Sequence, residues 1–222
     1  MARQLPLELP HRPSYSRDDL VVSEANRLAV GAIDAFPDWP HPVVLISGPP
    51  GSGKSHLAAV FAAEAGGATA RRDGVGAILA ERPFLGVVDD VDRGGLDEAS
   101  LFALVNAARL GGGSLLLTSR VLPAAMAIQT PDLRSRLAAA TTVPLGAPDD
   151  ALLTGVLAKL FSDRQIEVEP GALAYLVARM ERSLDAARRI VAEIDREALS
   201  AKRKVTRPLL RRVLDEGGWL FG

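Results

Sequence analysis

The stretch GPPGSGKS, from Gly48 to Ser55, has the residue types and spacing of a phosphate-binding loop. It matches the pattern G-x-x-x-x-G-K-[ST], follows the apolar run VVLIS and precedes a stretch with helical spacing. Glycines let backbone amides approach a phosphate closely, and the start of a helix carries partial positive charge. The sequence thus predicts a nucleotide site, as opposed to a glycine-rich turn that binds nothing. The residues expected to bind are Gly48, Pro49, Pro50, Gly51, Ser52, Gly53, Lys54, Ser55 and His56.

Each charged or hydroxyl side chain near this loop has its own expected role. Lys54 would reach the β- and γ-phosphates, and the hydroxyl of Ser55 would ligate Mg²⁺. Asp89 directly follows the apolar run FLGVV and would hold the ion through water. Asp90 would orient or deprotonate the attacking water, or alternatively cap a turn, since DDVDRGG is also loop-like. The expected cofactors are ADP or ATP together with Mg²⁺.

Apolar runs alternate with helical patterns in the first two thirds of the chain. This alternation predicts an α/β fold with a parallel sheet and crossover helices. One expected helix has Ser23 as its cap and Leu28 on its apolar side. The expected strands are Val43 to Ser47, Phe84 to Val88, Ser114 to Ser119 and Ala140 to Leu145, and the expected helices are Ser23 to Ala35, Lys54 to Ala65 and Leu96 to Leu110.

From Asp149 onward the strand signals end and helical spacing takes over. Apolar residues from Leu173 to Ile194 recur every three or four positions, which predicts one face of a long helix. Three parts are therefore expected: an extended N-terminal peptide over 1–14, a nucleotide-binding core over 15–146, and a helical domain over 147–222.

The overall composition is that of an ordinary globular protein, with 48% hydrophobic and 24% charged residues. A formal net charge of -1 gives no global field for nucleic acid or an anionic membrane. The basic run from Lys202 to Arg212 has acidic neighbours and a proline, so it is expected to be a solvated helix face. No cysteine is present and no apolar run is long enough to span a membrane. We expect a cytoplasmic protein without direct sequence-specific DNA binding.

The motifs GPPGSGKS, VVDDV, LLLTSR and DLRSRL, in this order and followed by a helical tail, resemble those of AAA+ ATPases of the DnaA-related branch. The segments LVVSEANRLA and GVLAKLFSDRQIEVEPGALAYL are similar to that branch too, so the resemblance covers nearly the whole chain. It is nearest to Hda-like members, which switch the initiator DnaA off. The resemblance implies an AAA+ P-loop core with a parallel sheet flanked by helices, a small helical lid, and a negative regulator of DNA replication initiation.

The same resemblance gives Arg136 the role of an arginine finger. Such a finger would enter the nucleotide site of DnaA and stimulate hydrolysis of its ATP. Without the family, an ordinary surface arginine paired with Asp132 is the simpler interpretation. Thr118 and Ser119 are the candidates to sense the γ-phosphate, with Arg120 where relatives often have a small acidic or amide residue.

In the lid, the family's sensor arginine aligns with Asp185, which leaves Arg182 and Arg188 as candidates one turn away. These departures imply weak or no hydrolysis by the chain itself, with nucleotide, ADP in particular, as a structural ligand.

The N-terminal QLPLEL is similar to the peptide with which Hda-like proteins dock on the β sliding clamp, at Gln4, Leu5, Leu7 and Leu9. Prolines disfavour a helix here and stiffen an extended peptide, which lowers the cost of ordering it in a groove. The alternative is a strand packed on the protein's own sheet.

The expected partners are thus DnaA and the DNA-loaded clamp, with no membrane, and with self-association left open. Two other functions stay open from the sequence. One is a self-contained AAA+ ATPase such as a helicase loader or remodelling enzyme, and the other is an interaction scaffold whose P-loop is a relic of the fold.

Overall fold

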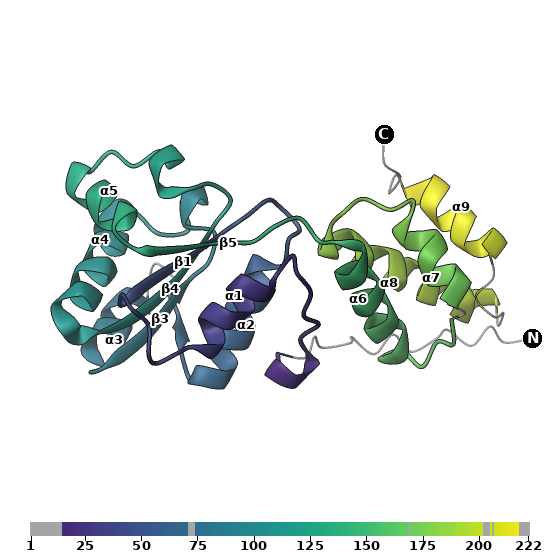
Figure 1. The fold of residues 1–222 in the computed structure, drawn as a ribbon, viewed down its shortest axis with the longest axis horizontal. Coiled ribbons are helices and arrows are strands. Elements are labelled where there is room, and N and C mark those ends of the chain that lie inside the picture. Colours follow the sequence, from purple (N-terminus) through teal and green to yellow (C-terminus); the bar gives the residue numbers. More distant parts are fainter. Residues whose placement is uncertain (1–14, 71–73, 169, 202–204, 206, 218–222) are drawn as a thin grey trace, which may run out of the picture. The chain divides into compact units, whose positions relative to one another are not determined.

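The computed structural model describes residues 15–70, 74–168, 170–201, 205 and 207–217 (Figure 1). The chain divides between Ala147 and Pro148 into two compact units. The predicted N-terminal peptide, 1–14, lies outside the described residues.

A parallel sheet of five strands forms the centre of the first unit. Its order is β2-β3-β4-β1-β5, so β1 lies between β4 and β5. All carboxyl ends of the strands therefore meet at one edge of the sheet, where open α/β sheets bind their ligands. The strands are β1 (Val43–Ser47), β2 (Ala68–Thr69), β3 (Phe84–Val88), β4 (Gly113–Ser119) and β5 (Thr141–Pro144).

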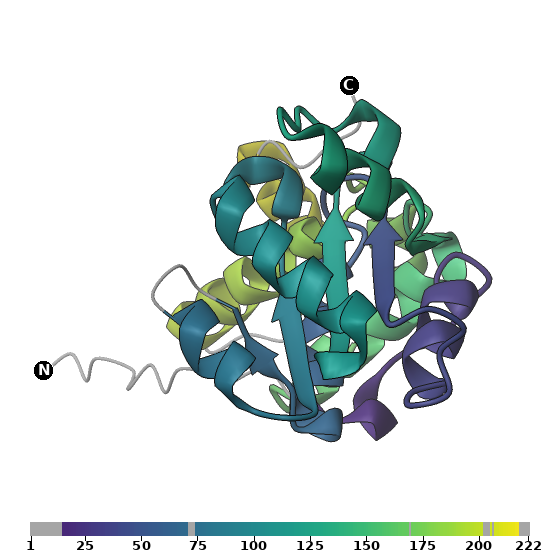
Figure 2. The same cartoon turned by 90° about the vertical axis from the view of Figure 1, so that its left-hand side faces the viewer.

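Side chains alternate between the two faces of the strands, and each face is covered by helices (Figure 2). On β1, Val43 and Leu45 pack with one set of helices, whereas Val44 and Ile46 pack with the other. All five β1 residues are buried, as a strand covered on both faces requires. The first set is α3 (Val75–Ala80), α4 (Glu98–Ala107) and α5 (Pro131–Ala138), and the second is α1 (Arg27–Asp34) and α2 (Lys54–Ala65). The predicted α/β class, a parallel sheet flanked by helices, is confirmed.

Helix α2 starts and stops at glycines in the left-handed region. Gly53 precedes it with φ 102° and Gly66 follows it with φ 71°. Residues with a Cβ are strained there, so these positions favour glycine. The predicted bounds Lys54 to Ala65 are the observed ones.

Helix α1 was predicted wrongly at its start. It begins at Arg27 and not near Ser23, because Asn26 folds back: its side-chain Oδ1 accepts from the Ser23 amide at 2.8 Å, and its Nδ2 donates to the Val21 carbonyl at 2.8 Å. The buried face consists of Ala29, Val30 and Ile33, whereas Leu28 is 56% exposed.

The connection from α4 to β4 is a short π-helical turn, Ala108–Gly112. Gly111 has φ 80° within it, and the neighbouring Leu110 is 78% exposed. This turn precedes β4, so it lies at the edge of the sheet opposite to the phosphate-binding loop.

The second unit is helical, consisting of α6 (Asp150–Ser162), α7 (Pro170–Val177), α8 (Leu184–Ala201) and α9 (Arg207–Gly217) (Figure 1). Asp149 caps α6 by accepting from the Leu152 amide at 2.7 Å. The single long helix predicted over Leu173 to Ile194 is wrong. Helix α7 ends at Val177. Helix α8 starts after buried Ser183, whose Oγ accepts from the Ala186 amide at 3.2 Å. The apolar spacing survives the break since Met180 and Leu184 are both buried.

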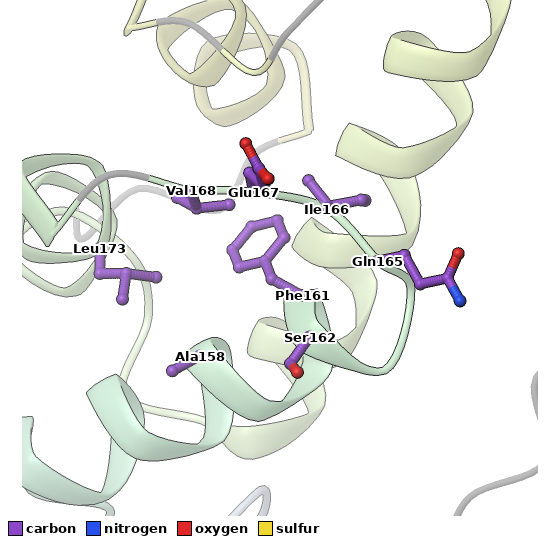
Figure 3. A pocket seen from close by; sticks show the side chains of 8 residues that line it. All are labelled: Ala158, Phe161, Ser162, Gln165, Ile166, Glu167, Val168 and Leu173. Carbon is purple, nitrogen blue, oxygen red and sulfur yellow. The ribbon is translucent and has the colours of Figure 1, made fainter.

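A hollow of about 390 Å³, lined by both apolar and polar side chains, lies between the end of α6 and the start of α7 (Figure 3). Phe161 lines it from α6, and Ile166 and Val168 line it from the connection. None of the predicted site residues lines this hollow. In the described part of the chain, no helix is both long and apolar enough to cross a bilayer.

Candidate functional site

The phosphate-binding loop connects the carboxyl end of β1 to α2. Gly51 and Gly53 have φ 70° and 102°, conformations that turn the loop and that side chains rarely allow. The hydroxyl of Ser52 donates to the Pro49 carbonyl at 2.8 Å and closes the turn. A Cβ on Gly48 would lie 2.2 Å from the Leu145 carbonyl oxygen, so only glycine fits beside the residue that follows β5.

Lys54 is the buried cation of this loop, with 5% of the residue exposed. Its Nζ donates to the carbonyls of Gly48 and Pro49, at 2.8 and 2.9 Å. Burial lowers the pKa of Lys54 from its ordinary value, and nearby Asp90 offsets part of that effect. Both acceptors are neutral, so the ammonium group is well placed to bind an added anion. This is the observation that fits a nucleotide phosphate.

The carboxyl ends of β3 and β4 are joined by buried Thr118. Its Oγ1 donates to Asp89 Oδ1 at 2.5 Å and accepts from the Asp90 amide at 2.8 Å. Asp90 adopts φ 50°, a left-handed conformation that is uncommon for a residue with a side chain. The two predicted carboxylates therefore project from a backbone that one hydroxyl holds in place.

Arg120 follows β4 and faces the residues that follow β3. Its Nη2 lies 3.5 Å from Asp90 Oδ2, and its amide donates to Asp92 Oδ1 at 3.1 Å. The Nε is buried and has no hydrogen-bond partner among the described residues. The preceding carbonyl, of Ser119, accepts from the Gly48 amide at 3.1 Å. Arg120 therefore directly follows a residue whose backbone is hydrogen-bonded to the phosphate-binding loop.

Replacing Thr118 with valine should destabilise the first unit by about 1–3 kcal/mol. The side chain is fully buried, so valine would leave the Asp89 carboxylate and the Asp90 amide without this partner. We expect the melting temperature to fall by roughly 2–12 °C, at about 2–4 °C per kcal/mol for a chain of this size. Thr118→Ser is the matched control because it keeps the hydroxyl. Equal melting temperatures for wild type and valine variant would contradict this role.

The predicted sensor hydroxyls are both inside the protein. Thr118 and Ser119 are fully buried, and the Ser119 hydroxyl donates to the Val121 carbonyl at 2.7 Å. In this structure the Thr118 hydroxyl joins β4 to Asp89 and Asp90, and the Ser119 hydroxyl bonds to the backbone of Val121 two residues later.

Ser55 and His56 lie in the first turn of α2. Ser55 is exposed, and the ring of His56 lies 5.8 Å from that of Tyr15, centre to centre. A serine hydroxyl and the Asp89 carboxylate supply the oxygen donors that Mg²⁺ prefers, and Mg²⁺ at nucleotide sites takes most other ligands from phosphate and water. Among the described residues, no group of three or more His, Cys, Asp or Glu side chains could hold a metal ion.

Arg136 lies in the last turn of α5 and is held against α4. Its guanidinium lies 4.8 Å from the centre of the Phe102 ring, Nη1 donates to Asn106 Oδ1, and Nη2 donates to Asp132 Oδ2 at 2.9 Å. Its side chain is 20% exposed, and within the described chain its Nε has no hydrogen-bond partner. Arg134, two residues earlier, is exposed and donates to the Ile128 carbonyl at 2.5 Å.

Glu98 fixes the approach to α5 from the first turn of α4. Its carboxylate accepts from the Thr130 hydroxyl at 2.6 Å and from the Gln129 and Thr130 amides at 2.7 and 2.9 Å. The hydroxyl bond, followed by the two amide bonds, lowers the pKa of Glu98. Helix α4 therefore both anchors the start of α5 and holds Arg136.

The lid candidates lie in the second unit, and both form ion pairs. Arg182 Nη2 pairs with Asp150 Oδ1 at 2.6 Å, and Arg188 Nη1 pairs with Asp185 Oδ1 at 3.0 Å. The predicted clamp residues, Gln4, Leu5, Leu7 and Leu9, lie outside the described residues.

Several residues that complete these sites had no role predicted from the sequence. Asp92 holds the backbone at Arg120, and Phe102 and Asn106 hold Arg136. The only available signal for the latter pair was their spacing of four on a helix, which places both on one face.

Solved structures of similar fold include two DnaA proteins. Domain III of DnaA from Thermotoga maritima has a TM-score of 0.76 at 17% identity, covering 94% of this chain and 98% of that one. AMPPCP-bound DnaA from Aquifex aeolicus has a TM-score of 0.69 at 19% identity, and the match covers 86% of this chain and 70% of that one. The Thermotoga maritima RuvB Holliday junction branch migration motor has a TM-score of 0.67 at 20% identity, and the match covers 91% of this chain and 72% of that one. At these identities the likeness shows the AAA+ fold alone.

Sequence comparison adds a family. No curated protein matches the chain significantly. Residues 150–214 match the family model described as "Hda, lid domain". The chain thus combines a lid that matches the Hda family with a core that has the fold of DnaA domain III, and the two findings together support a DnaA-related AAA+ protein of the Hda type.

Proposed function

We propose that this protein is a negative regulator of DNA replication initiation. It binds nucleotide in its own P-loop, docks on the DNA-loaded β sliding clamp and stimulates hydrolysis of ATP held by DnaA. The observation that carries the proposal is the lid of the Hda family, matched over 150–214, on a P-loop core. The proposed place of action is the cytoplasm.

The nucleotide part of the proposal is supported by Lys54, the buried cation with neutral acceptors. Loop amides and the start of α2 would bind the phosphates, with Lys54 at the β- and γ-phosphates. Ser55 and Asp89 would hold Mg²⁺, which neutralises phosphate charge when bound. The division into a nucleotide-binding core and a lid, with Arg182 or Arg188 as a lid sensor, is part of the same proposal.

The regulatory part is supported by Arg136. Its contacts with Phe102 and Asn106 restrict the guanidinium before any partner arrives, which lowers the ordering cost of a finger. A planar cation at the transferring phosphoryl group of DnaA-bound ATP would stabilise the charge that develops there.

The test is reconstitution with purified DnaA carrying labelled ATP, DNA-loaded clamp and this protein. Conversion of DnaA-bound ATP to ADP should accelerate only when all components are present. Rapid ATP hydrolysis by this protein alone would instead favour a self-contained ATPase. If the protein neither hydrolyses ATP alone nor accelerates hydrolysis of DnaA-bound ATP, yet still binds the clamp, a scaffold is favoured.

The clamp-binding segment has its own prediction. Changing Gln4, Leu5 and Leu9 together to alanine should weaken clamp binding by about two orders of magnitude or more, because each buried leucine contributes about 1.5–3 kcal/mol. The melting temperature should change by no more than about 2 °C if the peptide serves only the clamp. Surface binding to immobilised clamp and thermal melting measure both on one variant. A large loss of stability would instead indicate a strand of the protein's own sheet.

A further inference from the structure

We propose that Arg120 exchanges ion-pair partners, pairing with Asp90 when the terminal phosphate position is empty and with the γ-phosphate when a nucleoside triphosphate binds. This inference rests on the proposed nucleotide binding. It gives the site a means of distinguishing triphosphate from diphosphate that does not depend on the predicted hydroxyl sensors, which are both buried.

The position of Arg120 follows from backbone contacts. The Ser119 carbonyl bonds to the Gly48 amide, so the residue after β4 leaves the sheet beside the phosphate-binding loop. The Arg120 amide is held by Asp92, and the side chain is about one third exposed. Lys54 lies near enough for the charge of Arg120 to contribute to lowering the pKa of that lysine. Two cations thus adjoin the loop.

The contacts of Arg120 are those of a guanidinium with unused binding capacity. Its pairing with Asp90, at 3.5 Å, is long compared with the usual 2.7–2.9 Å of a charge-assisted bond. Its Nε is buried without a partner in the described residues. A guanidinium binds phosphate in a bidentate manner, so a terminal phosphate at this edge is a better partner than Asp90 as it stands.

Asp90 is held where it competes for that guanidinium. Its amide is bonded to Thr118, its backbone is left-handed, and its carboxylate is the ion-pair partner of Arg120. When Arg120 transfers to a phosphate, the Asp90 carboxylate loses its cation and is left beside the terminal phosphate. A diphosphate would leave the Arg120–Asp90 pair intact.

The experiment measures affinity, with Mg²⁺ present, for ADP and for AMPPCP in wild type, Arg120→Gln, Asp90→Asn and the double variant. Arg120→Gln should weaken AMPPCP binding about tenfold and change ADP binding less than twofold. Arg93→Gln, an exposed cation of the same loop, removes equal charge and should change neither. Melting temperatures confirm that each variant folds.

The double variant separates exchange from a fixed ion pair. If Arg120 leaves Asp90 on triphosphate binding, Asp90→Asn should tighten AMPPCP binding more in the wild-type background than in the Arg120→Gln background, since it also removes the competitor for the guanidinium. A fixed pair predicts the opposite order, with a larger effect of Asp90→Asn in the Arg120→Gln background, because in the wild type Arg120 would screen Asp90 from the phosphate. That order would overturn the proposal, as would unchanged AMPPCP affinity in Arg120→Gln. Failure of wild type to bind ADP would overturn the nucleotide site itself.

Discussion

Lys54→Ala should abolish nucleotide binding, weakening the affinity for ADP by at least about a hundredfold. The substitution removes the buried ammonium group, whose acceptors in the protein are neutral, from the position expected to face the phosphates. Saturating ligand at about 100 times its dissociation constant stabilises a protein by about 2.7 kcal/mol. At about 2–4 °C per kcal/mol, ADP should raise the wild-type melting temperature by roughly 5–11 °C and that of the variant by less than about 2 °C.

The control for this experiment must separate lost binding from lost folding. Lys54→Met keeps most of the buried volume while removing the charge, so it should melt near the wild-type temperature and still show no ADP-induced increase. An ADP-induced increase in either variant equal to that of wild type would contradict the role of Lys54.

The second large effect is expected from Arg136→Ala in the reconstituted reaction. Arginine fingers supplied by a partner contribute about 10³–10⁵ to the rate of phosphoryl transfer, which corresponds to about 4–7 kcal/mol of barrier. Stimulated hydrolysis of DnaA-bound ATP should therefore fall by about a thousandfold. The variant's own ADP affinity should stay within about twofold, since a finger acts on the nucleotide of its partner.

Arg134→Ala is the matched control on the same helix. Arg134 is exposed and donates to the nearby Ile128 carbonyl, so its loss should leave stimulation nearly unchanged. Arg136 also contacts Phe102 and Asn106, so its truncation is expected to lower the melting temperature modestly. Full stimulation by Arg136→Ala would remove this residue from the mechanism, whereas equal losses in both variants would point to helix α5 as a docking surface.

The parts of the fold that were best predicted from the sequence are those with strong local constraints. Strand β1 could be identified from an unbroken apolar run because both its faces are covered. Helix α2 could be bounded because Gly53 and Gly66 occupy left-handed positions at its two ends. Short elements with few residues to form a pattern, such as β2 and α3, carried no usable signal.

The errors have a common origin in side-chain bonds to the backbone. Asn26 shortens α1 by bonding to Val21 and Ser23, and Ser183 divides the predicted long helix by capping α8. Apolar spacing in a sequence does not reveal such bonds. Met180 and Leu184 are both buried and keep the helical spacing, although the helix is interrupted between Val177 and Leu184. The candidate site shows the same limit. Its motif residues could be identified from the sequence, whereas the partners of Arg120 and Arg136 depend on which strands and helices are neighbours.

The exposed turn before β4 also makes the protein convenient to label. The chain contains no cysteine, so Leu110→Cys would introduce a single thiol for a fluorescent dye. Leu110 is 78% exposed and lies at the amino ends of the strands, whereas the phosphate-binding loop lies at their carboxyl ends. A dye there would report tumbling and energy transfer without touching the nucleotide site, so the proposed binding to the clamp and to DnaA could be followed in real time on one molecule.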